Sequence, residues 1–379
     1  MKTIDRHDAA RAMTAPHDDR WQRPSWRRQV QRAAMGWFAD NARRLPWRGT
    51  RDRYRVWLSE IMLQQTQVVT VIPYFERFLE RFPTVADLAA ADEQTVMQLW
   101  EGLGYYRRAR QLHAAAKQVV DRHDGVFPRS YAEVLALPGV GRYTAGAILS
   151  IADGQRLPIV EANTQRLYSR LIASTSPPQE RAANALLWQF AEAILPPSDA
   201  GTFNQAAMEL GALVCTPKTP ACLTCPLRPN CAAVQLGLET TIPGRVKKIQ
   251  YEQRTEFALL VRHPETEAYL VHRVPAGQRW AGLWDFPRFG PPEVESVEGA
   301  AASTERQFDV SVAIGAKAKT IRHGVTRYRI TLEAFHAEAE QAFADTEDQR
   351  WLSARQLKTL PLSVTGRKLA DYLKTKRKT

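Results

Sequence analysis

Cysteine is scarce in this sequence of 379 residues, and all four cysteines lie between residues 215 and 231. None remains elsewhere for a disulfide, so a metal site in a reducing compartment is the better interpretation. No apolar run approaches the roughly 18 residues that a membrane-spanning helix needs. The first 24 residues are polar and lack the apolar core of a secretion signal. These absences argue against a disulfide-rich secreted protein and an integral membrane protein, and they predict a cytoplasmic one.

Size and charge narrow the class further. A chain of 379 residues exceeds what one hydrophobic core usually supports, so we expect two domains. The formal net charge is +12 at pH 7, which attracts polyanions, and nucleic acid is the commonest of these. A basic protein with no nucleic-acid partner is the alternative that composition leaves open.

The periodicity of apolar residues divides the chain into two parts. Spacing near 3.6 residues recurs from residue 25 to about 235, for example in 54–82, and predicts helices. Residues 236–254 are polar and basic, as a linker is. Short alternating runs such as 256–263 then predict strands, with helices at 351–360 and 364–379. We therefore predict a flexible tail at 1–24, a helical domain at 25–235, a linker at 236–254 and a smaller α+β domain at 255–379.

The four cysteines have the spacing Cys215-x6-Cys222-x2-Cys225-x5-Cys231. Four thiolates in one short loop can hold a tetrahedral metal ion or a four-iron cluster. A disulfide knot is disfavoured, because Cys222 and Cys225 are too close together in the chain. Ligand type alone leaves zinc as an alternative to iron and sulfide.

A glycine-containing turn, Pro138–Gly139–Val140–Gly141, lies between two expected helices. Glycine tolerates positive φ and therefore permits a tight connection. The free N–H groups and the positive dipole end of the second helix would bind phosphate without regard to base sequence. A plain connection between helices is the alternative reading.

Two acidic residues, Glu60 and Glu161, are candidates for catalysis. A helix that exposed Glu60 to water would also expose neighbours such as Leu58 and Leu63, so Glu60 is expected to face a cleft. Burial raises the pKa of a carboxyl group, which lets it act as a general acid near neutral pH. A surface position at a helix edge is the alternative for Glu60. The second acid, Glu161, could instead have a structural role, such as pairing with Arg166.

These motifs resemble the MutY family of adenine DNA glycosylases, within the endonuclease III superfamily. The resemblance is carried by the cysteine spacing, by LPGVGRYTAGAI, and by WLSEIMLQQTQVVTVIPYFERF followed by LWEGLGYYRRARQLH. It is strong over residues 25–235 and moderate over 255–290. It implies a helix-hairpin-helix glycosylase fold, a [4Fe-4S] cluster on the four cysteines at 215–231, and phosphate contacts from Gly139, Val140 and Gly141. It also implies a monomer that acts on double-stranded DNA in the cytoplasm, associated with the nucleoid.

The same resemblance assigns catalytic roles. The family's proton donor to adenine falls on Glu60. Its aspartate, which supports the sugar cation, falls on Glu161, so the acid is kept but lengthened by one methylene. Tyr143 and Asn163 are carried over as residues that orient the carboxylates. Bifunctional relatives have a lysine where this chain has Tyr143, so base removal without an efficient strand-cleaving step is implied.

Further residues are carried over for recognition. Trp47 and Arg48 would line the adenine pocket. The residues expected to replace lost pairing and stacking around the lesion are Gln64, Gln65, Thr66, Leu103, Tyr105 and Tyr106. The C-terminal domain resembles the family's Nudix-like recognition domain through Gly282–Leu283–Trp284, but it lacks the acidic box of Nudix hydrolases. At the loop that reads oxidised guanine, this chain has Thr326 and Arg327 where relatives have serine and histidine.

The sequence therefore predicts a monofunctional glycosylase that excises adenine mispaired with 8-oxoguanine or guanine in base excision repair. Two alternatives remain at this point. One is an endonuclease III-like glycosylase/lyase for oxidised pyrimidines, which Tyr143 and the extra domain disfavour. The other is a lesion-binding protein with impaired catalysis, because Glu161 replaces an aspartate.

Overall fold

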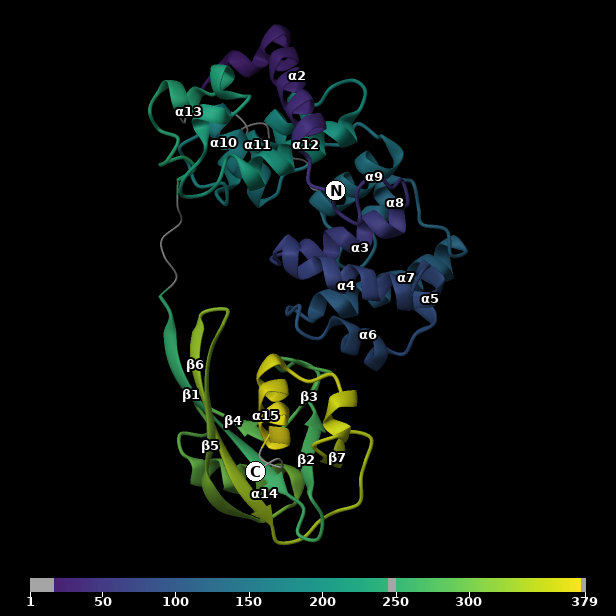
Figure 1. Ribbon diagram of the computed structural model, residues 1–379, viewed down its shortest axis with the longest axis vertical. Coiled ribbons are helices and arrows are strands. Elements are labelled where there is room, and N and C mark those ends of the chain that lie inside the picture. The colour runs from purple at the N-terminus through teal and green to yellow at the C-terminus, as the bar shows by residue number, and fades with distance from the viewer. Residues whose placement is uncertain (1–16, 245–249, 376–379) are drawn as a thin grey trace. The chain divides into compact units, whose positions relative to one another are not determined.

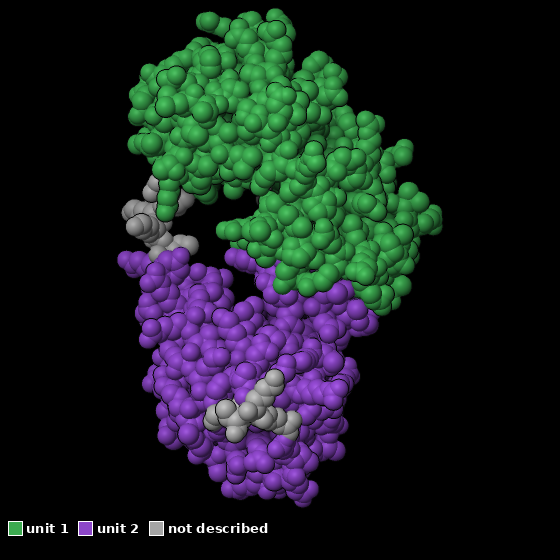
Figure 2. Space-filling view, viewed as in Figure 1, with its two compact units in different colours: residues 1–90, 111–247 green, residues 91–110, 248–379 purple. Residues whose placement is uncertain are grey.

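The computed structural model describes residues 17–244 and 250–375 and forms two compact units. Unit 1 comprises residues 1–90 and 111–247, and unit 2 comprises residues 91–110 and 248–379 (Figure 2). No helix in the described part of the chain is long and apolar enough to cross a membrane.

Unit 1 is helical, as the 3.6-residue periodicity predicts (Figure 1). Its elements are η1 (Asp19–Gln22), α2 (Pro24–Asn41), α3 (Arg53–Leu63), α4 (Val68–Arg81), α5 (Val85–Ala90), most of α7 (Arg107–His123), α8 (Tyr131–Leu135), α9 (Arg142–Asp153), α10 (Ala162–Leu171), α11 (Arg181–Ile194), α12 (Ala200–Leu213), η2 (Cys222–Thr224), η3 (Arg228–Asn230) and α13 (Ala232–Gln235).

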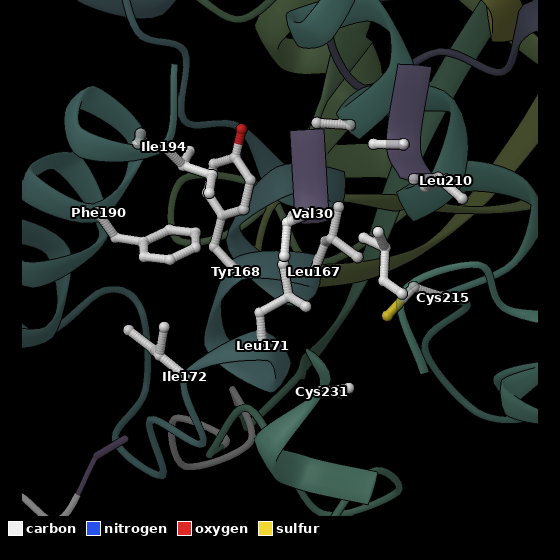
Figure 3. Close-up of a cluster of buried hydrophobic side chains, with 14 of the residues drawn as sticks. Val30, Leu167, Tyr168, Leu171, Ile172, Phe190, Ile194, Leu210, Cys215 and Cys231 are labelled. Carbon is white, nitrogen blue, oxygen red and sulfur yellow. The ribbon is translucent and has the colours of Figure 1, made fainter. Parts of the chain in front are cut away.

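One hydrophobic core of unit 1 forms where α2, α10, α11 and α12 meet. Val30, Leu167 and Phe190, from three of these helices, are buried together in it (Figure 3). Cys215 and Cys231 border the same cluster. The cysteine loop is therefore anchored on the core that also holds α10 and α12.

The glycine-containing turn joins α8 to α9. The Val140 N–H donates to the Leu137 carbonyl oxygen at 3.1 Å, and Gly139 has φ +76°. Proline followed by glycine at these two central positions is typical of a type II turn. A Cβ on Gly139 would also lie 2.9 Å from the Cβ of Gln111, so both backbone conformation and space favour glycine there.

Unit 2 is built on a seven-stranded sheet, in which the path β3-β2-β1-β6-β5 is extended by β4 on β1 and by β7 on β2. β1 and β6 run parallel, and the other pairs are antiparallel. The elements are α6 (Glu93–Trp100), β1 (Glu252–Arg262), β2 (Ala268–Arg273), β3 (Trp284–Asp285), β4 (Arg288–Phe289), α14 (Val297–Phe308), β5 (Val312–Val325), β6 (Tyr328–Ala339), β7 (Gln349–Ser353), η4 (Gln356–Thr359) and α15 (Val364–Thr375).

Strand β1 is apolar on both faces because a helix covers each face of the sheet. Phe257 and Leu259 share a buried cluster with Phe308 of α14. Leu260, on the opposite face, shares a second cluster with Leu369 of α15. The sequence of a strand that is buried on both faces is a continuous apolar run, whereas a strand buried on one face alternates apolar and polar residues.

The described elements depart from the sequence prediction at residues 351–360, which contribute to β7 and η4 instead of forming one helix. The helix predicted at 364–379 is present as α15 up to Thr375, and residues 376–379 lie outside the described residues. Of the tail expected at 1–24, residues 1–16 lie outside the described residues, and Asp19–Gln22 form a 3-10 helix whose Trp21 packs edge-on against Phe190. Residues 245–249 of the expected linker also lie outside the described residues.

A segment within the predicted helical domain groups with the sheet. Residues 91–110, which include α6, belong to unit 2. Glu101 forms an ion pair with Arg367 of α15 at 2.6 Å, and the Trp284 indole N–H donates to the Gln94 side chain at 3.1 Å. These contacts explain a grouping that helical periodicity does not reveal.

Candidate active site

Unit 1 contains a cavity of about 440 Å³ that brings together side chains from distant parts of the chain. Its walls come from α3, α9, the start of α10, α12 and residues 43–48. This volume lies within the range that small-molecule sites occupy. Glu60, Glu161, Tyr143, Asn163, Trp47 and Arg48 all line it.

Glu60 is a buried carboxyl group of the cavity, carried by a helix that is apolar almost all round. Every residue from Val56 to Met62 of α3 is buried. The pKa of Glu60 is raised from its usual value of 4.5 to about 7: burial is the largest cause, a hydrogen bond from Tyr143 opposes it, and the nearby Glu161 adds to it. Glu60 can therefore hold or release a proton near neutral pH.

Tyr143 holds Glu60 from the first turn of α9. Its hydroxyl donates a short hydrogen bond to Glu60 Oε2 and lies 3.5 Å from the Met208 sulfur. Burial, together with Glu60 and Glu161, raises the pKa of Tyr143 well above 10, so its hydroxyl keeps its proton. The turn at Gly139 to Gly141 thus places Tyr143, because α9 begins at the next residue.

Glu161 caps helix α10. Its carboxylate accepts hydrogen bonds from the backbone N–H groups of Asn163 and Thr164, each at 2.9 Å. The Thr164 hydroxyl accepts in return from the Glu161 N–H at 2.8 Å, which completes a capping box. Burial raises the pKa of Glu161, although these backbone donors favour its ionised form.

Arg166 braces this end of α10. It donates to Asn163 Oδ1 at 2.9 Å and to the carbonyl oxygens of Ala162 and Cys215 at 3.2 and 2.6 Å, and it also contacts the Gly211 carbonyl. A Cβ on Gly211 would lie 2.7 Å from the Asn163 Cβ, so glycine lets α12 approach α10 closely. Arg166 thereby joins the cavity wall to the cysteine loop.

A further carboxylate of the cavity, the buried Glu209, organises the part of the wall formed by Arg43, Trp47 and Arg48. It accepts paired hydrogen bonds from Arg43 at 2.8 and 2.6 Å and from Arg48 at 2.9 and 2.7 Å. Burial alone would raise the pKa of Glu209, but these arginines lower it to about 2. Trp47 is buried beside them and packs edge-on against Phe75, with 5.3 Å between ring centroids.

The sequence prediction missed several lining residues, among them Arg43, Gln205, Met208 and Glu209. Glu209 had a usable signal, because it is an acid within the apolar run Ala206–Val214, the same pattern that marks Glu60. Met208 had none, since methionine in a helix is commonly a core residue.

Gln64, Gln65 and Thr66 follow α3 directly and also line the cavity. Gln65 is exposed and has φ +57°, the left-handed conformation that non-glycine residues seldom adopt. These three residues are therefore grouped with the carboxylates, as their place in the sequence after Glu60 indicates.

The start of α9 leaves its first N–H groups available. Gly141 is the N-cap residue, and within the described residues no side-chain cap hydrogen bond is formed at this position. Such groups and the positive end of the helix dipole favour an anion. Arg142, the first residue of α9, stacks over the Trp188 ring at 3.7 Å from the centroid and adds positive charge beside the turn.

Cys215, Cys222, Cys225 and Cys231 surround one small hollow that apolar residues such as Leu167 also line. Among the described residues, no three His, Cys, Asp or Glu side chains are grouped so that they could hold one single metal ion. Arg170, one turn beyond Arg166, donates to the Cys215 sulfur at 3.2 Å. Four sulfur donors around a hollow fit the soft chemistry of an iron–sulfur group.

The residues expected at the lesion from the Leu103–Tyr106 segment belong to unit 2 and differ in exposure. Tyr105 is exposed and has φ +49°. Leu103 and Tyr106 are buried, and the Tyr106 hydroxyl lies 3.4 Å from the Leu362 carbonyl oxygen. Of the two tyrosines, Tyr105 alone presents its ring to solvent in this structure.

Thr326 and Arg327 form the two-residue turn between β5 and β6. Both are exposed, and Thr326 has φ +50°. The Thr326 hydroxyl donates to the Val325 carbonyl at 2.8 Å and still has lone pairs to accept. Arg327 lies over the Tyr328 ring, 5.1 Å from its centroid, and Arg254 lies over the same ring at 3.8 Å.

Family models match both parts of the chain. Residues 58–193 match the HhH-GPD superfamily of base excision DNA repair proteins, and residues 257–372 match the NUDIX domain. The fold and the cavity thus define a helix-hairpin-helix base excision repair protein with a Nudix-like second domain, as the sequence predicts.

Individual relatives narrow the class. An adenine DNA glycosylase of Mus musculus is 34% identical over 88% of this chain and 76% of its own length. An adenine DNA glycosylase of Homo sapiens is 40% identical over 69% of this chain, which spans 50% of the human protein. A solved thermostable thymine-DNA glycosylase is 27% identical, with a TM-score of 0.50 over 56% of this chain and 98% of its own. The chain belongs to the adenine DNA glycosylase family.

Proposed function

We propose that this protein is a monofunctional DNA glycosylase that excises adenine mispaired with 8-oxoguanine or guanine in duplex DNA. The observation that carries the proposal is that Glu60 and Glu161 line one cavity, with Tyr143 donating to Glu60. The endonuclease III-like alternative needs an amine nucleophile, and a tyrosine at position 143 cannot form a Schiff base.

Glu60 is the proton donor in this mechanism. Its pKa of about 7 leaves about half of it protonated at neutral pH and most of it protonated below, so it can protonate the purine ring of an extruded adenine. Protonation makes adenine a neutral leaving group. Glu60 then accepts a proton from the water that attacks the sugar, while Tyr143 holds the carboxylate in place.

Glu161 stabilises the positive charge that develops on the sugar. Its two carboxylate oxygens are fixed by the N–H groups of Asn163 and Thr164 rather than by a mobile side chain. This makes the arrangement similar to a retaining glycosidase, in which one carboxyl group donates a proton and the other supports the oxocarbenium ion. The longer glutamate is compatible with catalysis because the capped helix end sets its position.

The part of the cavity wall formed by Trp47, Arg48 and Glu209 recognises the base. Trp47 offers an apolar face, while Arg48 and the ionised Glu209 place donors and acceptors beside each other. Adenine presents both kinds of group on its edge, so such a paired wall suits it. A pyrimidine would fill less of the cavity.

The remaining residues bind the DNA and read the lesion. The start of α9 binds a phosphate, and Gln64, Gln65 and Thr66 fill the space left by the extruded base. Tyr105 offers an exposed ring on which a base can stack. From unit 2, Thr326 offers 8-oxoguanine a hydrogen-bond acceptor, and Arg327 offers it donors. The net charge of +12 supports non-specific attraction to DNA, and the protein acts as a monomer near the nucleoid.

We further propose that Cys215, Cys222, Cys225 and Cys231 hold a [4Fe-4S] cluster. When bound, the cluster would cross-link the loop on the core next to α10. Arg166 then connects that loop to the N-terminal part of α10, next to Glu161, and Arg170 connects it to the C-terminal end of the same helix. Purified protein is expected to contain about four irons per chain; a colourless protein that contains zinc would contradict this assignment.

A glycosylase assay tests the central proposal. Single-turnover release of adenine is measured on duplexes with adenine opposite 8-oxoguanine, guanine or thymine, and strand breaks are read with and without alkali. We expect release opposite the first two bases, strand breaks only after alkali, and no product trapped by borohydride. Cleavage without alkali, together with borohydride trapping, would favour the lyase; tight binding without adenine release would favour the impaired binder.

A further inference from the structure

The sulfur atom of Met208 lies inside the candidate active site. Met208 is carried by α12, next to Glu209, and its Sδ is 3.5 Å from the Tyr143 hydroxyl oxygen. The same hydroxyl donates to Glu60 Oε2. One hydroxyl hydrogen is therefore shared between the acceptor that the mechanism needs and a sulfur atom that it does not use.

Met208 is also accessible to a small oxidant. It lines the cavity and is partly exposed, whereas Met62 and Met97 are fully buried. Met35 is partly buried but packs against the core of α2, α10, α11 and α12 rather than lining the cavity. Among the described methionines, Met208 alone thus combines access through the cavity with contact to an active-site hydroxyl.

We propose that Met208 is a site of oxidation by hydrogen peroxide, and that its sulfoxide draws the Tyr143 hydroxyl away from Glu60. The second half rests on the proposed function, in which Tyr143 holds Glu60 for proton transfer. The site would make adenine release sensitive to peroxide.

The chemistry is a two-electron oxygen transfer. A lone pair on the Met208 sulfur attacks one oxygen of hydrogen peroxide, a sulfur–oxygen bond forms and the oxygen–oxygen bond breaks. The sulfur is oxidised and the peroxide is reduced, and its departing oxygen keeps one hydrogen and takes the other to leave as water. Reduction by a methionine sulfoxide reductase reverses the step.

The sulfoxide changes the competition for the Tyr143 hydrogen. A thioether sulfur is a weak acceptor, so the carboxyl oxygen of Glu60 receives the hydrogen in the reduced protein. A sulfoxide oxygen is polar and is bonded to the same sulfur, which lies 3.5 Å from the Tyr143 hydroxyl oxygen, so it competes for that hydroxyl hydrogen. Because Tyr143 has only one hydrogen to donate, a bond to the sulfoxide is a bond lost by Glu60.

The test compares three forms of the full-length protein: wild type, Met208→Leu and Met35→Leu. Each is treated with graded hydrogen peroxide and quenched with catalase, and its single-turnover rate of adenine release is divided by its own untreated rate. Mass spectrometry of the Met208 peptide reports oxygen addition. Wild type and Met35→Leu should lose up to roughly tenfold in rate, the scale of one hydrogen bond, and recover with the reductase. Met208→Leu should lose less than about twofold.

Two results would overturn the proposal. One is an equal loss in Met208→Leu, which would place the sensitive group elsewhere, for example among the cysteines. The other is full activity in wild type whose Met208 peptide is completely oxidised. If the untreated protein releases no adenine, the proposed function fails separately, and the peptide mass alone decides the modification: oxidation of Met208 supports it, and resistance overturns it.

Discussion

At the scale of single residues, the same cavity contains two buried carboxyl groups whose pKa values move in opposite directions. Burial raises the pKa of Glu60 to about 7, whereas Arg43 and Arg48 lower that of Glu209 to about 2. The difference lies in the partners: a tyrosine hydroxyl cannot neutralise a carboxylate, but two guanidinium groups can. One wall can therefore exchange protons, while the other keeps a fixed charge.

The pKa of Glu60 sets the pH dependence of the reaction. The protonated form is the active one, so single-turnover adenine release should be highest below about pH 7 and should fall about tenfold per pH unit above it. Rates measured from pH 5 to pH 9 at constant ionic strength test this. A rate that rises as the pH increases through 7 would contradict the assignment of Glu60 as the acid.

The free energy of unfolding should also depend on pH through Glu60, and it should fall as the pH rises. The folded protein holds the Glu60 proton more tightly than the unfolded chain, whose value is near 4.5. The contribution of Glu60 to the free energy of unfolding is therefore fully present below about pH 4.5 and is lost as the pH rises through about 7.

At the scale of elements, helix α10 links capping to catalysis through Glu161. Replacing Glu161 with aspartate keeps a favoured N-cap residue but draws the carboxylate back from the cavity. We expect the free energy of unfolding to change by less than ~0.5 kcal/mol, while the rate falls by up to about a hundredfold. Denaturant unfolding and single-turnover assays on the same preparation measure both quantities.

The matched control for this prediction is Glu161→Ala, which loses the cap as well as the charge. It should cost ~1 kcal/mol of stability and also lose activity. If Glu161→Asp proved faster than the natural protein, the glutamate would be a handicap to catalysis rather than a residue positioned by the capped helix.

The sequence predicted those elements that depend on residues close together in the chain. The turn at Pro138 and Gly139, the helices of unit 1 and strand β1 all follow from turn chemistry or apolar periodicity. Strand β5 did not stand out, because it is a mostly exposed edge strand with no alternating apolar pattern. The ion pair of Arg48 with Glu209 was equally hidden, since 161 residues separate the partners.

Only some residues of the candidate site could likewise be predicted from the local sequence. Glu60 could be predicted from a charged residue in an apolar helix, whereas the roles of Tyr143 and Asn163 came only from the family resemblance. Their contacts depend on how α9 and α10 pack against α3 and α12, which no short stretch of sequence encodes. Tyr106, expected at the lesion, is buried because tertiary packing decides which of two adjacent tyrosines faces solvent.

At the scale of the whole molecule, the two units carry different tasks in the proposed function. The carboxylates lie in unit 1, and the Thr326–Arg327 turn lies in unit 2. Thr326→Ala should therefore reduce the preference for adenine opposite 8-oxoguanine over guanine by roughly fivefold to tenfold, the scale of one hydrogen bond. The ratio of the two single-turnover rates, measured at one salt concentration, gives this preference.

Arg329→Ala provides the matched control in the same hairpin. Arg329 is exposed and lies over the Tyr251 ring at 4.7 Å from the centroid. Its loss should weaken binding to all duplexes alike and should leave the ratio unchanged, as loss of a phosphate contact does. An unchanged ratio in Thr326→Ala would remove Thr326 from the lesion site.

The most direct test of the account is adenine release by Glu60→Gln, measured beside its affinity for the same mispaired duplex. Glutamine keeps the shape of Glu60 but cannot donate the proton, so release should fall at least a hundredfold while duplex binding persists. A Glu60→Gln protein that releases adenine at the natural rate would contradict the central claim that a buried, protonated carboxyl group in this cavity expels the base.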